Sequence, residues 1–218
     1  MPIVRRKDKA LATLQTILDA AEQVFFEKGV SGATLEGIAQ RAKVTRGAIY
    51  WHFANREDIL FAVMDRTYRI FEESILQLSL SNEPHTVEAL RNYSVGMLKD
   101  IAADRQKQRA IAIIMFKHEH SLEKNAIWKR RQQAYKRMLK SLSAYLEKMW
   151  GLTNSSDRTK RIQIMLIAQA FLFFNHGVIL NFLQFPATVN LKKDAERYVD
   201  ILFHSPFQLH QPAKKSQR

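Results

Sequence analysis

The chain has 218 residues, a formal net charge of +13 and no cysteine. This length allows a sizeable hydrophobic core and one or two domains. The lack of cysteine excludes a disulfide framework and thiolate chemistry, and it suits a reducing cytoplasm. The charge favours a polyanionic partner, but residues 1–56 hold 9 basic and 5 acidic side chains, against 25 and 16 in residues 57–218. Most of the excess charge therefore lies outside the first 56 residues.

The N-terminal segment is basic and leads into an amphipathic helix rather than an apolar signal core, so we expect no export. Its basic arm, Arg5, Arg6, Lys7 and Lys9, is interpreted either as a contact to DNA or as a solvated terminus. The helix that follows should end at Gly29. Its apolar stripe is formed by Leu11, Leu14, Leu18, Ala21 and Phe25.

Two short helices joined by a tight turn come next. Thr34 and Thr45 are each suited to cap a helix. In the second helix Ile49 and Phe53 lie one turn apart and should face inward, which leaves small, polar and aromatic side chains outside. This pattern describes a helix-turn-helix motif, whose second helix lies in the major groove of DNA. A three-helix domain that binds no DNA is the alternative.

We expect base contacts at the start of the second helix and phosphate contacts around it. An arginine such as Arg46 can pair with guanine, and the Gly47–Ala48 pair lets the backbone approach the DNA closely. Phosphate contacts fix register more than sequence. Trp51 is either a contact or a core residue. The predicted DNA-binding residues are Thr34, Lys43, Thr45, Arg46, Gly47, Ala48, Tyr50, Trp51, His52 and Arg56.

The remainder of the chain shows helical periodicity without a strand pattern or an internal repeat. We therefore predict an all-α fold, with a three-helix DNA-binding domain at 1–55, a ligand-binding and dimerisation domain at 56–204 and a poorly ordered tail at 205–218. The predicted later helices span 56–80, 86–103, 105–118, 121–149, 159–184 and 191–203.

The apolar segment 162–183 is long enough to span a bilayer, but polar residues interrupt it on several sides. We expect it to be buried against its own domain and a second subunit instead. In the last helix, Ala195, Tyr198, Val199 and Leu202 form a stripe that two protomers can pack into a four-helix interface.

No arrangement of residues predicts an enzyme, a cofactor or a metal site. His118 and His120 are two positions apart, so on a helix they point about 200° from each other and cannot chelate one ion. A nucleophile–base pair and a glycine-rich phosphate loop are both missing from the sequence. The basic series Lys129–Lys140 is interpreted as a solvated helix face, with a contact to DNA or to an acidic partner as the alternative.

The run TLEGIAQRAKVTRGAIYWHFANREDIL, Thr34 to Leu60, resembles the helix-turn-helix signature of the TetR family of dimeric transcriptional repressors. Within it, VTRGAIYWHF is similar to the AcrR-like multidrug-efflux branch. Downstream, FLQFPATVNLKKDAERYVDIL, Phe182 to Leu202, is similar to the end of that branch's ligand-binding domain. Lys43 departs from the pattern, because the family usually has glycine at this turn. If the backbone is left-handed there, lysine costs about 1 kcal/mol.

The resemblance implies that the positions of Tyr50, His52 and Arg56 contact the DNA backbone and that the helix 56–80 couples ligand binding to the DNA-binding domain. It also implies an apolar and aromatic cavity and a dimer interface from the last two helices. The residues that the resemblance places around the cavity are Tyr68, Phe71, Met115, Phe116, Leu172, His176 and Leu180. Asn175 is added as a polar neighbour, and for each of these residues packing in the core is the alternative. The predicted interface residues are Phe182, Ala195, Tyr198, Val199 and Leu202.

From these features we predict a cytoplasmic, dimeric, ligand-responsive repressor that binds a palindromic operator in double-stranded DNA. It should control a multidrug efflux pump operon, respond to a small apolar or aromatic inducer and not insert into a membrane. One alternative is a regulator of the same fold that senses one metabolite for a metabolic operon. Another is a membrane-associated or partner-binding helical protein whose motif is vestigial.

Overall fold

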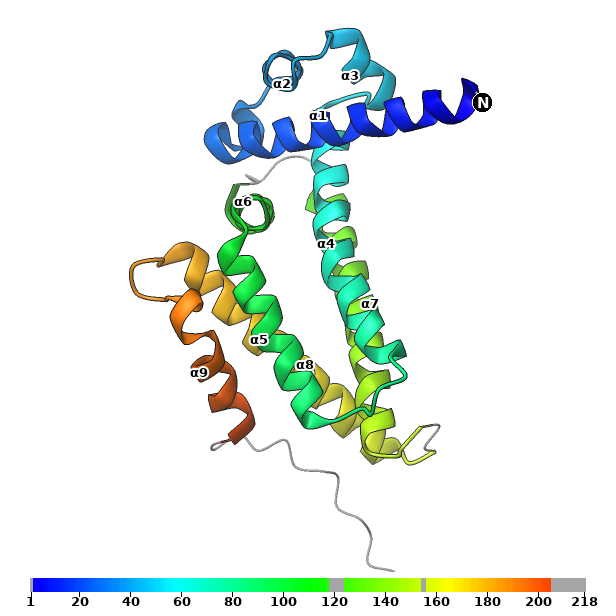
Figure 1. Cartoon of the computed structure of the whole chain (residues 1–218), viewed down its shortest axis with the longest axis vertical. Coiled ribbons are helices and arrows are strands. Elements are labelled where there is room, and N and C mark those ends of the chain that lie inside the picture. Colours follow the sequence, from blue (N-terminus) through cyan, green and yellow to red (C-terminus); the bar gives the residue numbers. More distant parts are fainter. Residues whose placement is uncertain (1, 118–123, 154–155, 205–218) are drawn as a thin grey trace, which may run out of the picture. The chain divides into compact units, whose positions relative to one another are not determined.

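The computed structural model describes residues 2–117, 124–153 and 156–204. Every regular element in these ranges is helical, which confirms the predicted all-α fold class. The elements in Figure 1 are α1 (Pro2–Gly32), α2 (Leu35–Ala42), α3 (Arg46–His52), α4 (Arg56–Leu80), α5 (Val87–Ala103), α6 (Arg105–Ala112), the π-helical segment η1 (Ile113–Lys117), α7 (Lys124–Met149), α8 (Arg158–Gln184) and α9 (Leu191–His204).

The helices form two compact units, Met1–Arg69 with Arg105–Arg131, and Ile70–Asp104 with Gln132–Arg218. By packing, α6 and η1 thus belong with the N-terminal helices, and α4 and α7 each begin in the first unit and continue in the second. The predicted boundary at residue 55 separates the DNA-binding part of the chain from the ligand-binding part, whereas the two units are defined by packing. The predicted boundary therefore stays a prediction. The predicted tail 205–218 lies outside the described residues, as do His118 and His120.

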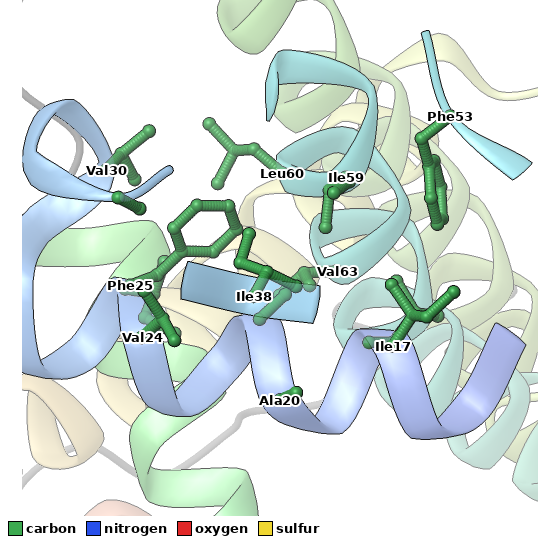
Figure 2. Close-up of a cluster of buried hydrophobic side chains, with 14 of the residues drawn as sticks. Ile17, Ala20, Val24, Phe25, Val30, Ile38, Phe53, Ile59, Leu60 and Val63 are labelled. Carbon is green, nitrogen blue, oxygen red and sulfur yellow. The ribbon is translucent and has the colours of Figure 1, made fainter. Parts of the chain in front are cut away.

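The core of the first unit is built mainly from α1, α2 and the start of α4, and α3, η1 and the start of α7 add buried isoleucines to it. Figure 2 shows Ile38 of α2 among side chains of α1, such as Phe25, and of α4, such as Ile59 and Val63. All four side chains are fully buried. Burying a side chain of this kind contributes about 1.5–3 kcal/mol, so this cluster holds the two short helices on α1 and α4.

Helix α1 differs from its predicted form at both ends. Its helical backbone begins at Pro2, so the basic arm is a continuation of the helix. The core cluster begins near Leu14 and Ile17, and Leu11 lies beyond it with 58% of its surface exposed. At the other end Gly29 has φ 72° and ψ 166°, and a further helical turn continues to Gly32. The helix is therefore broken at the residue where the sequence predicts its end.

The second unit contains α5, α8 and α9, which pack on one another. Leu98 of α5, Phe171 of α8 and Ala195 of α9 are almost completely buried. Two ion pairs join α5 to α9: Arg91 Nε lies 2.6 Å from Asp200 Oδ1, and Lys99 Nζ lies 2.5 Å from Glu196 Oε1. Helix α9 is thus fixed to α5 by an apolar stripe with charged residues beside it.

The dimer interface predicted from α8 and α9 stays a prediction, and the protomer shows how its residues pack. Ala195, Val199 and Leu202 are buried within the protomer itself, because α9 turns its apolar stripe toward α5. Tyr198 and Phe182 are half-buried. The periodicity identified the apolar face of α9 correctly, but that face meets a helix of the same chain.

Within the described residues, α8 is the one helix long and apolar enough to cross a membrane, with a mean hydropathy of 1.6 in its most apolar window. Only 28% of that window is buried. Its exposed large side chains include Ile162, Met165, Leu166 and Phe173. The expected burial of α8 on several sides is therefore not reached within one protomer.

Candidate nucleic-acid interface

Helix α3 turns one apolar side into the first unit and leaves the rest of its surface free. Ile49 is fully buried and Phe53, just after the helix, is 8% exposed, as the spacing predicts. Tyr50 is 48% exposed and Trp51 is 70% exposed. Trp51 is therefore a surface residue, which excludes the core interpretation. A surface tryptophan and tyrosine on a seven-residue helix form an aromatic face available to a partner.

The two short helices are capped by their predicted threonines. Thr34 Oγ1 accepts from the Gly37 N–H at 3.0 Å, and Thr45 Oγ1 accepts from the Ala48 N–H at 3.2 Å. Both threonines are exposed. Because each cap uses the oxygen as an acceptor, the hydroxyl hydrogen remains available to donate to a phosphate.

The turn between α2 and α3 is left-handed at Lys43, with φ 55° and ψ 38°. Its N–H donates back to Gln40 O at 3.2 Å, and the Val44 N–H donates to Ala39 O at 3.1 Å. These bonds close the end of α2. The left-handed backbone at Lys43 is the conformation in which lysine is expected to cost about 1 kcal/mol more than glycine. The Lys43 side chain is exposed at the turn.

Arg46 and Tyr50 form a pair on the outer face of α3. Arg46 Nη2 donates to Tyr50 Oη at 3.1 Å, and its guanidinium carbon lies 5.4 Å from the centre of the tyrosine ring. The hydrogen bond to Tyr50 raises the pKa of Arg46 above its usual value. The pair holds a charged, exposed guanidinium along the helix surface, and its remaining N–H groups suit a guanine edge.

Gly47 leaves open space on the same face. A Cβ atom added to Gly47 would have Thr45 Oγ1, at 3.9 Å, as its nearest neighbour. The fold therefore tolerates a larger residue there. A requirement for glycine at this position would have to come from a partner that approaches the backbone.

His52 and Arg56 are more constrained than the sequence predicts. His52 is half-buried, its ring meets Trp51 edge-on at 4.5 Å, and burial lowers its pKa. It is therefore mainly neutral at pH 7 and has one N–H to offer. Arg56 Nη1 donates to Ser31 O at 2.8 Å and to Ala33 O at 3.2 Å. Arg56 thus closes the end of α1, and its phosphate contact remains a prediction.

An ion-pair cluster that no local sequence pattern indicates joins α1 to α4. Arg66 of α4 donates to Asp19 Oδ1 at 2.8 Å and to Gln15 Oε1 at 3.1 Å, and it also pairs with Glu22. Glu22 is 2% exposed, and burial raises its pKa although Arg66 opposes the rise. Gln106 of α6 donates to Asp19 at 2.8 Å. The cluster therefore joins α1 to both α4 and α6.

The predicted ligand-binding residues are divided between the two units, so their joint lining of one cavity stays a prediction. Asn175 is buried, and its amide is used within the core: Oδ1 accepts from Ser94 Oγ at 2.5 Å and Nδ2 donates to Phe171 O at 3.0 Å. His176 and Phe116 are exposed. The half-buried members are Tyr68 and Met115 in the first unit and Phe71, Leu172 and Leu180 in the second.

Family models match both parts of the chain. Residues 17–63 match the bacterial regulatory proteins of the tetR family, and residues 85–205 match the C-terminal region of MAATS-type transcriptional repressors. The chain is 28% identical over 199 residues to the HTH-type transcriptional regulator TtgR of Pseudomonas putida, which covers 90% of this chain and 92% of the relative.

Solved structures agree with these matches. The structure of SmeT, the repressor of the Stenotrophomonas maltophilia multidrug efflux pump SmeDEF, aligns with a TM-score of 0.67 and 26% identity over 92% of this chain and 94% of SmeT. The SmeT–triclosan complex aligns with a TM-score of 0.73 and 24% identity over 95% and 98% of the two chains. With its capped helix-turn-helix and both parts matched, the chain belongs to the tetR family of bacterial regulatory proteins and is a transcriptional repressor of that family.

Proposed function

We propose that this repressor binds a palindromic operator as a homodimer, controls a multidrug efflux pump operon and leaves the operator when an apolar or aromatic compound binds. The observation that carries the DNA-binding part is the outer face of α3. It presents a charged Arg46 held by Tyr50, an unobstructed Gly47 and the cap Thr45, and Thr34, which caps α2, also has a free hydroxyl hydrogen. Such a face provides donors for base edges and phosphates together.

The efflux assignment is supported by the relatives. SmeT represses a multidrug efflux pump and forms a complex with triclosan. This chain shares 26% identity with SmeT over nearly its whole length. The ligand response requires that the compound bind more tightly to a conformation of the dimer in which the two α3 helices are spaced too far apart or too close together to fit the operator. The operator affinity then falls by the difference between the two binding free energies.

The homodimer is supported by the exposed side chains of α8. Leu166 is 54% exposed and Phe173 is 60% exposed, and Ile162 and Met165 lie on the same helix. An exposed apolar helix face of this kind marks an interaction site, and a second copy of α8 covers it with two-fold symmetry. On this proposal α8 is an interface helix, and the protein is cytoplasmic and does not insert into a membrane.

A selection from random double-stranded DNA with the full-length protein tests the proposal. We expect enrichment of a palindrome whose half-sites lie about one helical turn or somewhat more apart. A panel of apolar and aromatic compounds is then tested for release of the selected DNA. Release by many compounds supports efflux control, whereas release by one compound alone favours a metabolic operon. If no sequence is enriched, the proposed operator binding is wrong.

A further inference from the structure

One hydroxyl group in the first unit is buried without an acceptor. Tyr68 lies on α4 next to the core cluster, and its Oη atom is inaccessible to solvent. No atom of the described residues completes a hydrogen bond to it with good geometry. Burial raises the pKa of Tyr68 to about 12, so the group is a protonated donor at neutral pH. A buried donor without an acceptor destabilises a fold, which is a reason to look for a ligand there.

The nearest cation is Arg131 on α7. It is half-buried, and its charge and a side-chain hydrogen bond to the Tyr68 hydroxyl both oppose the rise in the pKa of Tyr68. This contact leaves the hydroxyl hydrogen of Tyr68 without an acceptor. Arg131 Nη2 lies 3.9 Å from Met115 Sδ, a weak acceptor. Throughout the part of the chain that the structure describes, no carboxylate lies within ion-pair distance of its guanidinium.

The neighbouring arginine shows that this situation is particular to Arg131. The Arg130 guanidinium lies over the Phe61 ring at 4.3 Å and faces Asp65 Oδ2 at 4.0 Å. Asp65 is also the acidic side chain that acts on Tyr68. The local acid is thus engaged by Arg130, and Arg131 has no carboxylate partner among the described residues.

The chemistry of the two groups specifies a partner. A protonated tyrosine and a guanidinium are both donors, so a group that satisfies both must be an acceptor with several lone pairs. A carboxylate meets this requirement and forms the strong, charge-assisted hydrogen bonds that arginine favours. Met115 beside them belongs to η1, and π-helical turns are frequent at functional sites.

We propose that Tyr68 and Arg131 form an anion subsite and that the effector of this repressor is an organic acid with an apolar body, bound through its carboxylate. This inference rests on the proposed ligand response and names the chemical class of the ligand. The apolar body has hydrophobic surface beside the subsite, because Met115 and Phe61 pack against the core cluster.

The test uses three probes with one aromatic body: 2-naphthoate, neutral 2-naphthamide and cationic 2-naphthylmethylamine. Their binding to the full-length protein is measured by calorimetry at pH 7.5. The variants are Arg131→Gln and Tyr68→Phe, with Lys129→Gln as the control that removes one charge from the exposed side of the same helix. Operator binding by each protein is measured in parallel.

We expect naphthoate to bind at least about tenfold more tightly than the amide or the amine. Arg131→Gln should weaken naphthoate binding roughly 10- to 100-fold and Tyr68→Phe roughly 3- to 10-fold, in line with charge-assisted and neutral hydrogen bonds. Binding of the amide should be almost unchanged in Arg131→Gln, and Lys129→Gln should resemble the natural protein.

Equal binding of the three probes, or equal losses in Arg131→Gln and Lys129→Gln, would overturn the anion subsite and leave the regulatory function standing. Failure of naphthoate to bind at all would also overturn it. The parallel DNA measurement separates the two claims. If the natural protein does not bind operator DNA, the proposed function is wrong, but the result says nothing against the anion subsite.

Discussion

At the scale of single residues, Arg46 is the side chain on which sequence recognition depends in this account. Its hydrogen bond to Tyr50 keeps the guanidinium on the exposed face of α3. Replacing Arg46 by alanine should remove roughly 1–3 kcal/mol of operator discrimination. The control is Lys28→Ala, which removes one exposed charge from α1. The measurement is the affinity for operator DNA and for scrambled DNA. An unchanged ratio of the two affinities in Arg46→Ala would show that Arg46 does not recognise the operator sequence.

Gly47 allows DNA contact to be separated from folding. The space around it accepts a methyl group, and alanine favours a helix over glycine by about 1 kcal/mol. We expect Gly47→Ala to unfold at the same or a higher urea concentration than the natural protein. Operator affinity should nevertheless fall, because the added methyl group keeps the backbone from the DNA. Unchanged affinity would mean that the backbone does not approach the DNA at Gly47.

Glu22 should give a recognisable pH dependence. Burial raises its folded-state pKa above the usual 4.5, so the folded state binds the proton more tightly than the unfolded state. The contribution of protonated Glu22 to the free energy of unfolding is complete below about pH 4.5, and it is lost as the pH rises through the folded-state pKa. Glu22→Gln lacks this titration. The stability of the variant relative to the natural protein should therefore rise with pH above 4.5, as urea unfolding at several pH values can measure. A constant difference would contradict the burial argument.

At the scale of the elements, the turn between α2 and α3 combines a left-handed lysine with a predicted phosphate contact. Lys43→Gly should stabilise the protein by about 1 kcal/mol, because glycine accepts a left-handed backbone without cost. If Lys43 also contacts a phosphate, binding to all DNA sequences should weaken, and the slope of log affinity against log salt should fall by about 1. Urea unfolding and a salt titration measure the two effects. A gain in stability without a change in the salt slope would mean that Lys43 strains the turn but does not contact a phosphate.

Sequence patterns predicted the local elements better than their partners. The caps at Thr34 and Thr45 and the inward positions of Ile49 and Phe53 depend on neighbours within one or two turns, so periodicity and cap chemistry suffice. The stripe of α9 was also identified, but a stripe does not say which surface covers it. Within the protomer it packs on α5, and its contact with a second protomer stays a prediction.

The contacts that the sequence did not reveal join distant positions. Arg66 meets Glu22 across 44 residues, and Tyr68 approaches Arg131 across 63. An arginine in a basic helix resembles any solvated charge until its neighbours are known. The difference between Arg130 and Arg131 arises from tertiary structure, and no local rule distinguishes them.

At the scale of the whole molecule, the proposed interface on α8 makes a prediction about assembly. Phe173→Glu should place a charge in this proposed interface and produce a monomer that remains folded, because Phe173 is 60% exposed. Leu76→Glu, on an exposed site of α4, is the matched control and should remain a dimer. Sedimentation gives the assembly state and circular dichroism the fold. A dimeric Phe173→Glu protein would place the interface elsewhere.

The central claim, that α3 reads a specific operator, is tested most directly by fluorescence anisotropy at physiological salt. The labelled DNA comes from upstream of the gene, and scrambled DNA of equal length is the reference. Salt is essential because a chain with a net charge of +13 binds any DNA in dilute buffer. We predict a preference of about 1,000-fold for the upstream DNA, and most of it should be lost in Arg46→Ala. Equal affinity for both DNAs, together with no sequence enriched in the random selection, would contradict it.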